Sequence, residues 1–369
     1  CHFTIFETEL VQRHGGFRPT MDGAQDFDLA LRLLPELRHV EHAPYPLYHW
    51  RAWSESTALT IEAKPWAQEA GQRAQQEYLD RSGGGAAIPS RITGLNEIHP
   101  LISGGPKVSV IIPTIGTVKA GGSRRFVDDC VRSLREAETH IELTVIAVTT
   151  GEIDPIDGVD CQVVYRPRKG FNFAEAINMG RLEAGGDYLL LLNDDTTAKN
   201  PDPVRRLLEI GQRSGVGAVG AKLTYPDGRL QHTGIVLLPS GPTHVNIAKP
   251  GNFPGYFGST LTPRNYLAVT AAAMLTSSEA FDAVGGFDKA FARDFNDVDY
   301  CLRLRDAGYR VAWTPYAEFV HHEGASIVRK AADHGELTEF SERWAERYPV
   351  DPFYSPALNQ HLERLYEPL

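Results

Sequence analysis

Hydrophobic and polar positions along residues 105–225 predict strands and helices in alternation. Short apolar runs predict strands at 108–112, 143–148, 162–165, 189–192 and 216–223. Apolar residues at helical spacing predict helices near 124–138, at 173–184 and after Pro203. Asn172 followed by Glu175 is typical of a capping box before the second helix. This alternation predicts a doubly wound, mostly parallel α/β sheet flanked by helices.

The predicted strand at 189–192 consists of four leucines, which indicates burial on both of its faces. Asn193, Asp194 and Asp195 follow directly, at the edge where open α/β sheets bind ligands. Carboxylate oxygens suit Mg²⁺ or Mn²⁺, and such an ion suits a diphosphate. Asp also favours turns, so a simple acidic turn explains the same residues. The motif alone leaves both interpretations open.

An internal repeat relates the start of the chain to its second half. Residues 26–33 and 297–304 share the pattern Asp-x-Asp-x-x-Leu-Arg-Leu, and Gly-Gly-Phe precedes each copy. Each copy is followed at the same distance by a proline, and then by His49 or His321. We therefore expect 1–60 to be the C-terminal part of a first, incomplete module and 106–330 to be a complete second one.

The remaining segments carry weaker patterns. A helical pattern covers about 64–81, and a Gly/Pro-rich stretch follows as far as residue 105. We interpret 61–105 as a helical segment and linker, and 331–369 as a C-terminal helical tail. The chain starts at Cys1 within an apolar-rich segment, which suggests a fragment of a longer protein.

Composition narrows the functional classes. A chain of 369 residues, with 42% hydrophobic and 23% charged residues, is long enough for two domains. A net charge of −10 argues against a nucleic-acid partner. Four widely spaced cysteines indicate reduced thiols in a cytoplasmic protein rather than a disulfide framework. No apolar stretch in the sequence approaches the length of a membrane span.

Six motifs in order carry a resemblance to a known family. They are Pro113-Thr114, Asn172 to Gly180, Asn193-Asp194-Asp195, Gly285 to Asp288, Asn296 to Asp299, and His321 to Gly324. On these motifs the chain resembles a family-2 glycosyltransferase with the GT-A fold. It is similar to bacterial transferases that build O-antigen and related surface polysaccharides, of the tandem-domain type.

The resemblance implies metal-dependent, inverting transfer of a sugar from a nucleoside-diphosphate sugar to a glycan or lipid-linked glycan. Asp195 would bind the divalent metal, Mn²⁺ or Mg²⁺, and Asp194 would lie against the ribose or the sugar. A second metal contact would come from His321 or His322, and the repeat favours His321. A packed histidine without a ligand is the alternative. A hydrolytic metal site formed with Glu323 is weak, because the HExxH spacing is missing.

Asp297 matches the general base that an inverting transferase needs to deprotonate its acceptor. Asp299 is the neighbour with which it could be confused. On a helix the two side chains point about 200° apart, so only one can face a cleft. An acid that stabilises the N-terminus of a helix is the alternative interpretation, and both roles are compatible.

The resemblance also assigns residues around the substrates. Pro113, Thr114, Arg168, Asn172 and Asn178 are expected to contact the nucleotide, while the base stays open between UDP, dTDP and GDP. On the acceptor side we expect Asn296, Tyr256 and Trp313. Tyr256 belongs to a Gly/Pro-rich stretch at 241–264 whose aromatic rings suit stacking on sugars, and an irregular packed loop is the alternative for this stretch.

Two other classes remain open at this point, namely a non-catalytic nucleotide-sugar-binding scaffold and a nucleotidyltransferase. A nucleotidyltransferase normally has a Gly-rich, basic phosphate loop after the first strand, and residues 121–125 match such a loop only weakly. We expect a cytoplasmic protein with no nucleic-acid partner. Peripheral association with the inner face of the plasma membrane or with an export complex is a further expectation.

Overall fold

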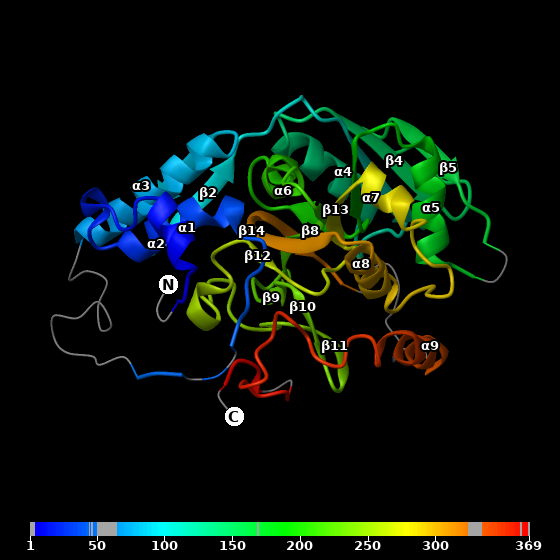
Figure 1. The fold of residues 1–369 in the computed structure, drawn as a ribbon. Coiled ribbons are helices and arrows are strands. Elements are labelled where there is room, and N and C mark those ends of the chain that lie inside the picture. Colours follow the sequence, from blue (N-terminus) through cyan, green and yellow to red (C-terminus); the bar gives the residue numbers. More distant parts are fainter. Residues whose placement is uncertain are drawn as a thin grey trace. The chain divides into compact units, whose positions relative to one another are not determined.

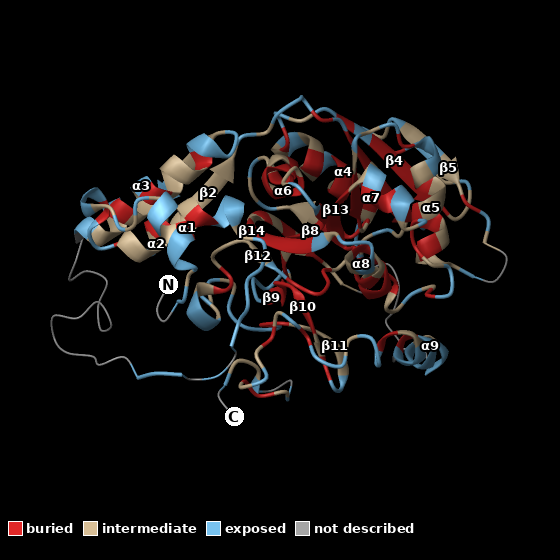
Figure 2. Ribbon diagram, viewed as in Figure 1, coloured by how far each residue is buried: buried red, intermediate tan, exposed pale blue. Residues whose placement is uncertain are grey.

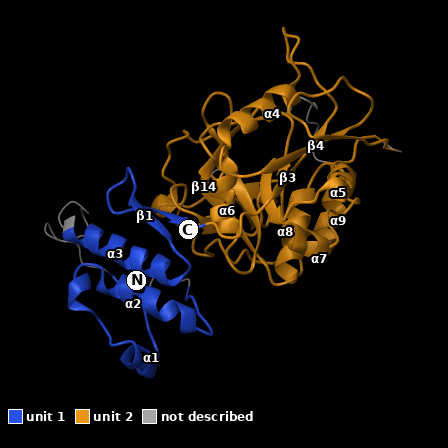
Figure 3. Cartoon of the chain, turned by 90° about the horizontal axis from the view of Figure 1, so that it is seen from above, with its two compact units in different colours: residues 1–101 blue, residues 102–369 orange. Residues whose placement is uncertain are grey.

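The computed structural model describes residues 4–43, 45, 47–49, 65–167, 170–323, 334–361 and 364–367. The chain divides into two compact units, residues 1–101 and 102–369 (Figure 3). Each unit has its own hydrophobic core, and all six family motifs lie in the second unit.

In its described residues, the first unit combines three α-helices with a β-hairpin. Leu10, Leu29 and Leu33 form its small core. Its elements are α1 (Thr8–Arg13), the 3-10 turns Pro19–Met21 and Leu34–Glu36, α2 (Gln25–Leu33), α3 (Pro65–Arg81), β1 (Gly85–Pro89) and β2 (Asn96–Pro100).

The hairpin corrects the interpretation of 85–100 as loose linker, because β1 and β2 pair in antiparallel register. Gln76 of α3 holds strand β1 in place through two hydrogen bonds. Its side-chain amide donates to the carbonyl of Gly85 at 3.0 Å and accepts from the Ala87 N–H at 3.0 Å. A single helix side chain thus satisfies two backbone groups of the strand, which composition cannot reveal.

The second unit is built on a ten-stranded sheet with the order β12-β14-β8-β13-β6-β3-β4-β5, to which β7 and β9 add at β14 and β8 (Figure 1). The strands are β3 (Val108–Thr114), β4 (Leu143–Thr149), β5 (Cys161–Val164), β6 (Tyr188–Leu192), β7 (Thr196–Ala198), β8 (Val216–Thr224), β9 (Leu230–His232), β12 (Arg264–Asn265), β13 (Ala273–Ser277) and β14 (Arg310–His321). A separate hairpin joins β10 (Ile235–Leu238) to β11 (Gly241–His244).

Strands β3 to β6 are mutually parallel, and β14 is parallel to β8. Strand β13 runs antiparallel between β6 and β8. The expectation of a mostly parallel sheet is therefore confirmed. The antiparallel strand β13 between β6 and β8 was not predicted from the sequence.

Helices cover both faces of this sheet, which is the doubly wound arrangement expected. Helices α4 (Phe126–Ala137) and α6 (Pro203–Gly211) pack into one core, and α5 (Phe173–Glu183), α7 (Ser278–Ala283) and α8 (Asn296–Asp306) pack into the other. The leucine strand serves both cores, because Leu189 and Leu191 face the second core whereas Leu190 and Leu192 face the first. Burial on both faces of the central strands is visible in Figure 2.

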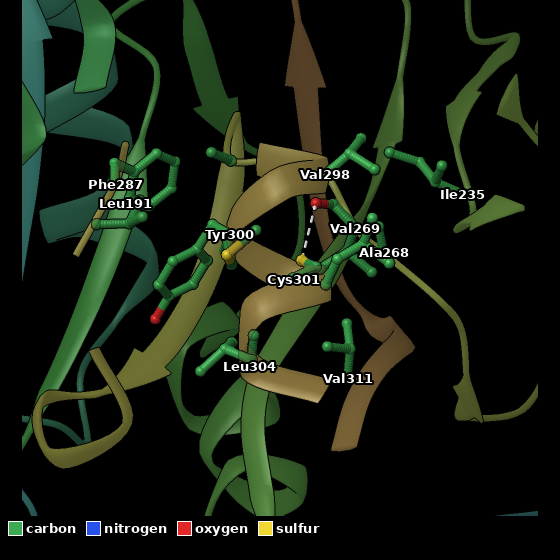
Figure 4. Close-up of a cluster of buried hydrophobic side chains, with 14 of the residues drawn as sticks. Leu191, Ile235, Ala268, Val269, Phe287, Val298, Tyr300, Cys301, Leu304 and Val311 are labelled. Atoms are coloured by element: carbon green, nitrogen blue, oxygen red, sulfur yellow. Dashed lines mark hydrogen bonds between the residues drawn. The ribbon is translucent and has the colours of Figure 1, made fainter. Parts of the chain in front are cut away.

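Helix α8 is buried around most of its circumference (Figure 4). Val298, Tyr300, Cys301 and Leu304 pack among the surrounding strands and helices, and the Cys301 thiol lies 3.7 Å from the carbonyl of Val269. Burial raises the pKa of this thiol, so it stays protonated at neutral pH. Packing on so many sides holds the N-terminus of the helix in a defined place.

The two copies of the sequence repeat make the same contacts. Arg303 donates to Asp299 and to the carbonyls of Val284 and Gly286. At the matching positions, Arg32 donates to Asp28 and to the carbonyls of His14 and Gly16. The motif thus specifies a local structure in both units. That the first unit is the end of a second glycosyltransferase module stays a prediction.

Gly180 of α5 lies directly against β3, and replacing it with alanine is expected to destabilise the second unit by about 1–2 kcal/mol. A Cβ there would lie 2.4 Å from Cγ2 of the buried Ile111. This overpacking outweighs the gain in helix propensity, which is at most about 1 kcal/mol. Chemical denaturation of both proteins measures the difference.

Gly185 provides the control, because a Cβ at this position meets nothing within 4 Å. Gly185→Ala should stay within about 0.5 kcal/mol of the wild type. Equal stability of the Gly180→Ala protein and the wild type would contradict the close packing.

Among the described residues, none of the helices combines the length and apolar character that a membrane crossing needs. Among the described cysteines, Cys130 and Cys301 are buried and Cys161 is partly buried, each as a free thiol.

Candidate active site

A cavity of about 530 Å³ opens in the second unit where β3 and β6 end and where α8 begins. Thr114 reaches it from β3, Asp194 and Asp195 from the turn after β6, Asp297 from α8 and His321 from the end of β14. The carboxyl ends of parallel strands meet at one edge of the sheet, so residues that are distant in sequence come together here.

The acidic pair after β6 is buried in the wall of this cavity, and its two members have different partners. The Thr114 hydroxyl donates to Oδ2 of Asp194 at 2.6 Å. Asp195 instead places Oδ1 at 3.0 Å from Nε2 of His321. The same ring nitrogen lies 3.3 Å from the side-chain nitrogen of Asn193. The pair is therefore not an exposed acidic turn, because both carboxylates are buried in the cavity wall and contact residues of other strands.

Of the two adjacent histidines, only His321 has its ring at the acidic pair. The backbone N–H of His322 donates to the carbonyl of Asp195 at 3.0 Å, which aligns β14 with the acidic turn. Its ring lies against Phe126, with centroids 5.6 Å apart. Burial, helped by the nearby Lys119 ammonium, lowers the pKa of His322 and favours its neutral form.

Asp297 and Asp299 point in different directions from α8, as the helical angle predicts. Asp297 lines the cavity, where its carboxylate accepts from the N–H groups of Ala271 at 3.1 Å and Val298 at 2.9 Å. Asp299 is fully buried and accepts from Arg303, Arg343 and Trp344. Only Asp297 can meet a substrate, and Asp299 holds the helix to its surroundings.

The residue before this helix has an unusual backbone. Phe295 has φ 61° and ψ 0°, in the left-handed region that costs a bulky residue free energy. Its ring stacks on Phe340 of α9 (His334–Trp344), with centroids 4.9 Å apart. This packing offsets the strain and sets the direction in which Asn296 and Asp297 leave the turn.

The residues predicted for the nucleotide fall into three groups. Pro113 and Thr114 line the cavity. Asn172 and Asn178 do not, and both side-chain amides are used in the fold. Asn172 caps α5 by accepting from the Glu175 N–H and donates to the Lys289 carbonyl, while Asn178 makes two bonds to the backbone of Phe287. Arg168 lies outside the described residues.

Of the acceptor-side residues, Asn296 lines the cavity, whereas Tyr256 and Trp313 do not. Trp313 is fully buried, and its indole N–H donates to the carbonyl of Ala221 at 3.1 Å. Its assignment to the acceptor was wrong, because the side chain belongs to the core beneath the sheet edge. Tyr256 is partly exposed and stacks on Tyr366, with centroids 5.6 Å apart.

Several cavity residues were not predicted from the sequence. They are Tyr225, Gln231, Thr270, Arg293 and Asp294, and Phe171 and Phe173 line the cavity as well. His244 also lines the cavity and lies 3.1 Å, between Nδ1 atoms, from the buried His232. Burial lowers the pKa of His232 well below its ordinary value, so this ring is uncharged at neutral pH.

Another group of potential ligands, Glu138, His140 and Asp202, lies outside the cavity. The Glu138 carboxylate already accepts from the N–H groups of Val204 and Arg205 at the start of α6 and from those of His140 and Ile141. These bonds explain the cluster as a helix cap.

The second unit combines a doubly wound α/β sheet, an acidic pair that contacts a histidine, and a carboxylate on a nearby helix. These features define the class of protein that the six sequence motifs indicate, the glycosyltransferases. The chain is homologous to bacterial glycosyltransferases and to a protein of O-antigen biosynthesis.

Three relatives illustrate this homology. The chain is 36% identical to the uncharacterised protein y4gI of Sinorhizobium fredii, over 98% of the chain and 41% of the relative. It is 32% identical to the O-antigen biosynthesis protein RfbC of Myxococcus xanthus, over 97% of the chain and 28% of the relative. It is 30% identical to an N-acetylglucosaminyl-diphospho-decaprenol L-rhamnosyltransferase of Mycobacterium tuberculosis, over 40% of the chain and 51% of that protein. The chain thus spans only about a quarter to a half of these relatives.

No family model matches the chain. Among solved structures, a mannosyltransferase from Pyrobaculum calidifontis in complex with GDP-Man and Mn²⁺ is 15% identical, with 74% of this chain and 70% of that chain covered and a TM-score of 0.43.

Proposed function

We propose that this protein transfers a sugar from a nucleoside-diphosphate sugar to a glycan or lipid-linked glycan in surface polysaccharide synthesis, with a divalent metal and with inversion at the anomeric carbon. The observation that carries the proposal is the placement of Asp195, His321 and Asp297 around one cavity.

The charge of the cavity supports a metal-dependent donor. Among the described residues that line it, Arg293 is the one permanent cation, against five carboxylates, those of Asp194, Asp195, Asp294, Asp297 and Glu323. A diphosphate is itself an anion and would be repelled by this wall unless a cation lay between them. The carboxylate of Asp195 and the imidazole of His321 form a donor set that suits Mn²⁺, so these residues would hold the ion. When bound, it would neutralise the charge that develops on the leaving diphosphate.

Asp297 supplies the proton acceptor in this scheme. Its carboxylate is oriented by two backbone N–H groups and stays open to the cavity, so it can take the proton from an acceptor hydroxyl as that oxygen attacks the anomeric carbon. Attack from the side opposite to the diphosphate inverts the configuration. The glycan or lipid-linked acceptor and any association with a membrane or an export complex stay predictions.

Replacing Asp195 with asparagine tests the proposal, because it removes one charge and keeps the shape of the side chain. We expect the wild type to release nucleoside diphosphate slowly from one member of a panel of UDP-, dTDP- and GDP-sugars with Mn²⁺. The variant should lose this release, and its Mn²⁺ affinity should fall by more than about 100-fold, the upper end of outer-shell effects. Diphosphate release and isothermal titration with Mn²⁺ measure the two effects.

Asp227→Asn serves as the control, because Asp227 lies in an exposed turn beside Arg229, outside the cavity. Wild-type Mn²⁺ binding and release in the Asp195→Asn protein would overturn the metal assignment. Failure of the wild type to bind or turn over any donor of the panel would overturn the transferase function.

A further inference from the structure

Gln231 on β9 connects the histidine of the site to a second carboxylate. Its side-chain oxygen lies 2.8 Å from Nδ1 of His321, and its side-chain nitrogen donates to Oε2 of Glu323 at 2.9 Å. Gln231 is 4% exposed, so its amide is largely shielded from bulk solvent. Gln231 and His321 are 90 residues apart in the sequence, and the pairing of β9 and β14 with β8 brings them together.

This chain of bonds determines which nitrogen of His321 carries a proton. A carboxylate only accepts hydrogen bonds, so the amide nitrogen of Gln231 must face Glu323. The amide oxygen then faces His321, and it can only accept. Nδ1 of His321 must therefore be the protonated nitrogen, and in the neutral ring Nε2 presents its lone pair.

The lone pair of Nε2 points at a second acceptor. Oδ1 of Asp195 is 3.0 Å away, and neither atom has a proton to offer the other when the ring is neutral. Two acceptors so close and so deeply buried repel each other unless a positive charge lies near both. Asn193 contributes one weak donor to Nε2, at 3.3 Å.

We propose that Gln231, held by Glu323, is a positioning residue that fixes His321 as the Nδ1–H tautomer and so commits Nε2 to a divalent cation shared with Asp195. This inference rests on the proposed function and extends it to two residues beyond the direct metal contacts. Partners of this kind orient a ligand histidine and raise its basicity.

The test is a titration of the full chain with Mn²⁺ alone. Electron paramagnetic resonance measures the concentration of the free ion at each step of the titration. Gln231→Leu removes the acceptor at Nδ1 and leaves the direct contacts in place. We expect the dissociation constant for Mn²⁺ to rise about 10- to 100-fold. Circular dichroism of each variant reports whether the fold is kept.

A swapped double variant separates positioning from support of the fold. In Gln231→Glu with Glu323→Gln, the carboxylate accepts from Nδ1–H and also from the new amide, so the same tautomer is favoured. We expect this protein to regain Mn²⁺ affinity to within a few-fold of the wild type. Thr233→Val is the matched control, since it removes buried hydrogen bonds of Thr233 to Val245 and Asn246 and leaves His321 untouched. Its Mn²⁺ affinity should equal that of the wild type.

Wild-type Mn²⁺ affinity in a folded Gln231→Leu protein would overturn the inference. A folded double variant that binds as weakly as Gln231→Leu would overturn it as well. These results differ from a failure of the proposed function, in which the wild type itself would bind no Mn²⁺.

Discussion

Replacing Asp297 with asparagine is expected to slow sugar transfer by about 10²- to 10⁴-fold, the usual contribution of a general base. The amide keeps the size of the carboxylate but cannot take a proton from an acceptor hydroxyl. Donor binding should remain, because Asp195 and His321 are unchanged. Steady-state rates with the donor identified in the panel, together with titration of that donor and Mn²⁺, measure both effects.

The internal repeat provides the control for this prediction. Asp26 occupies the matching position at the start of α2, and one of its carboxylate oxygens accepts from the next N–H, that of Phe27, at 2.9 Å, as in Asp297. Asp26→Asn should therefore reproduce any local effect on a helix N-terminus without slowing transfer. Full activity of the Asp297→Asn protein, or loss of donor binding in it, would contradict the assignment of Asp297 as the base.

Replacing Asp299 with alanine is expected to destabilise the second unit by about 3–5 kcal/mol, the usual cost of breaking an ion pair by removing its buried partner. The carboxylate is 0% exposed and accepts from Arg303 at 2.8 Å, from Arg343 at 2.9 Å and from the Trp344 indole at 3.0 Å. These partners join α8 to α9 and to the loop before α8. Urea denaturation of the wild type and the variant measures the change in the free energy of unfolding.

Asp297→Asn serves as the stability control here, because it lies on the same helix and faces the cavity. Its unfolding free energy should stay within about 1 kcal/mol of the wild type, near the worth of a single hydrogen bond. The two aspartates should therefore show opposite profiles, activity lost at one and stability lost at the other. An Asp299→Ala protein as stable as the wild type would contradict the role of this network.

Local sequence patterns predicted the elements of the second unit from β3 to β8, apart from the short strand β7. The leucines of β6 indicated a strand buried on both faces, and they contribute to both cores. The capping pattern at Asn172 predicted the start of α5, although the Glu175 side chain bonds to the Tyr165 hydroxyl rather than back to the cap. Each of these features depends on residues within a few positions of one another, which is the range over which periodicity carries information.

Predictions that depended on distant partners succeeded less often. Asn178 is polar and lies in a family motif, but its amide is occupied by the backbone of Phe287, 109 residues away. Trp313 is an aromatic residue in a strand, and nothing in its surroundings along the chain distinguishes an exposed platform from a core position. No local sequence pattern distinguishes Gln231 as a site residue. All three residues of β9 are buried, so the strand shows no alternation of buried and exposed positions that would single out Gln231.

The sequence by itself determined the alternation of strands and helices from β3 to β8, the carboxylates at the end of β6, and the helical phase that separates Asp297 from Asp299. These properties follow from side-chain chemistry and from the repeat lengths of helix and strand. Only the tertiary structure decided which polar side chains face the cavity and which form hydrogen bonds within the fold. Asn172, Asn178 and Asp299 belong to the second kind. The tertiary structure alone brought Gln231 and Glu323 to His321, because the pairing of strands far apart in sequence sets which side chains meet at the edge of a sheet.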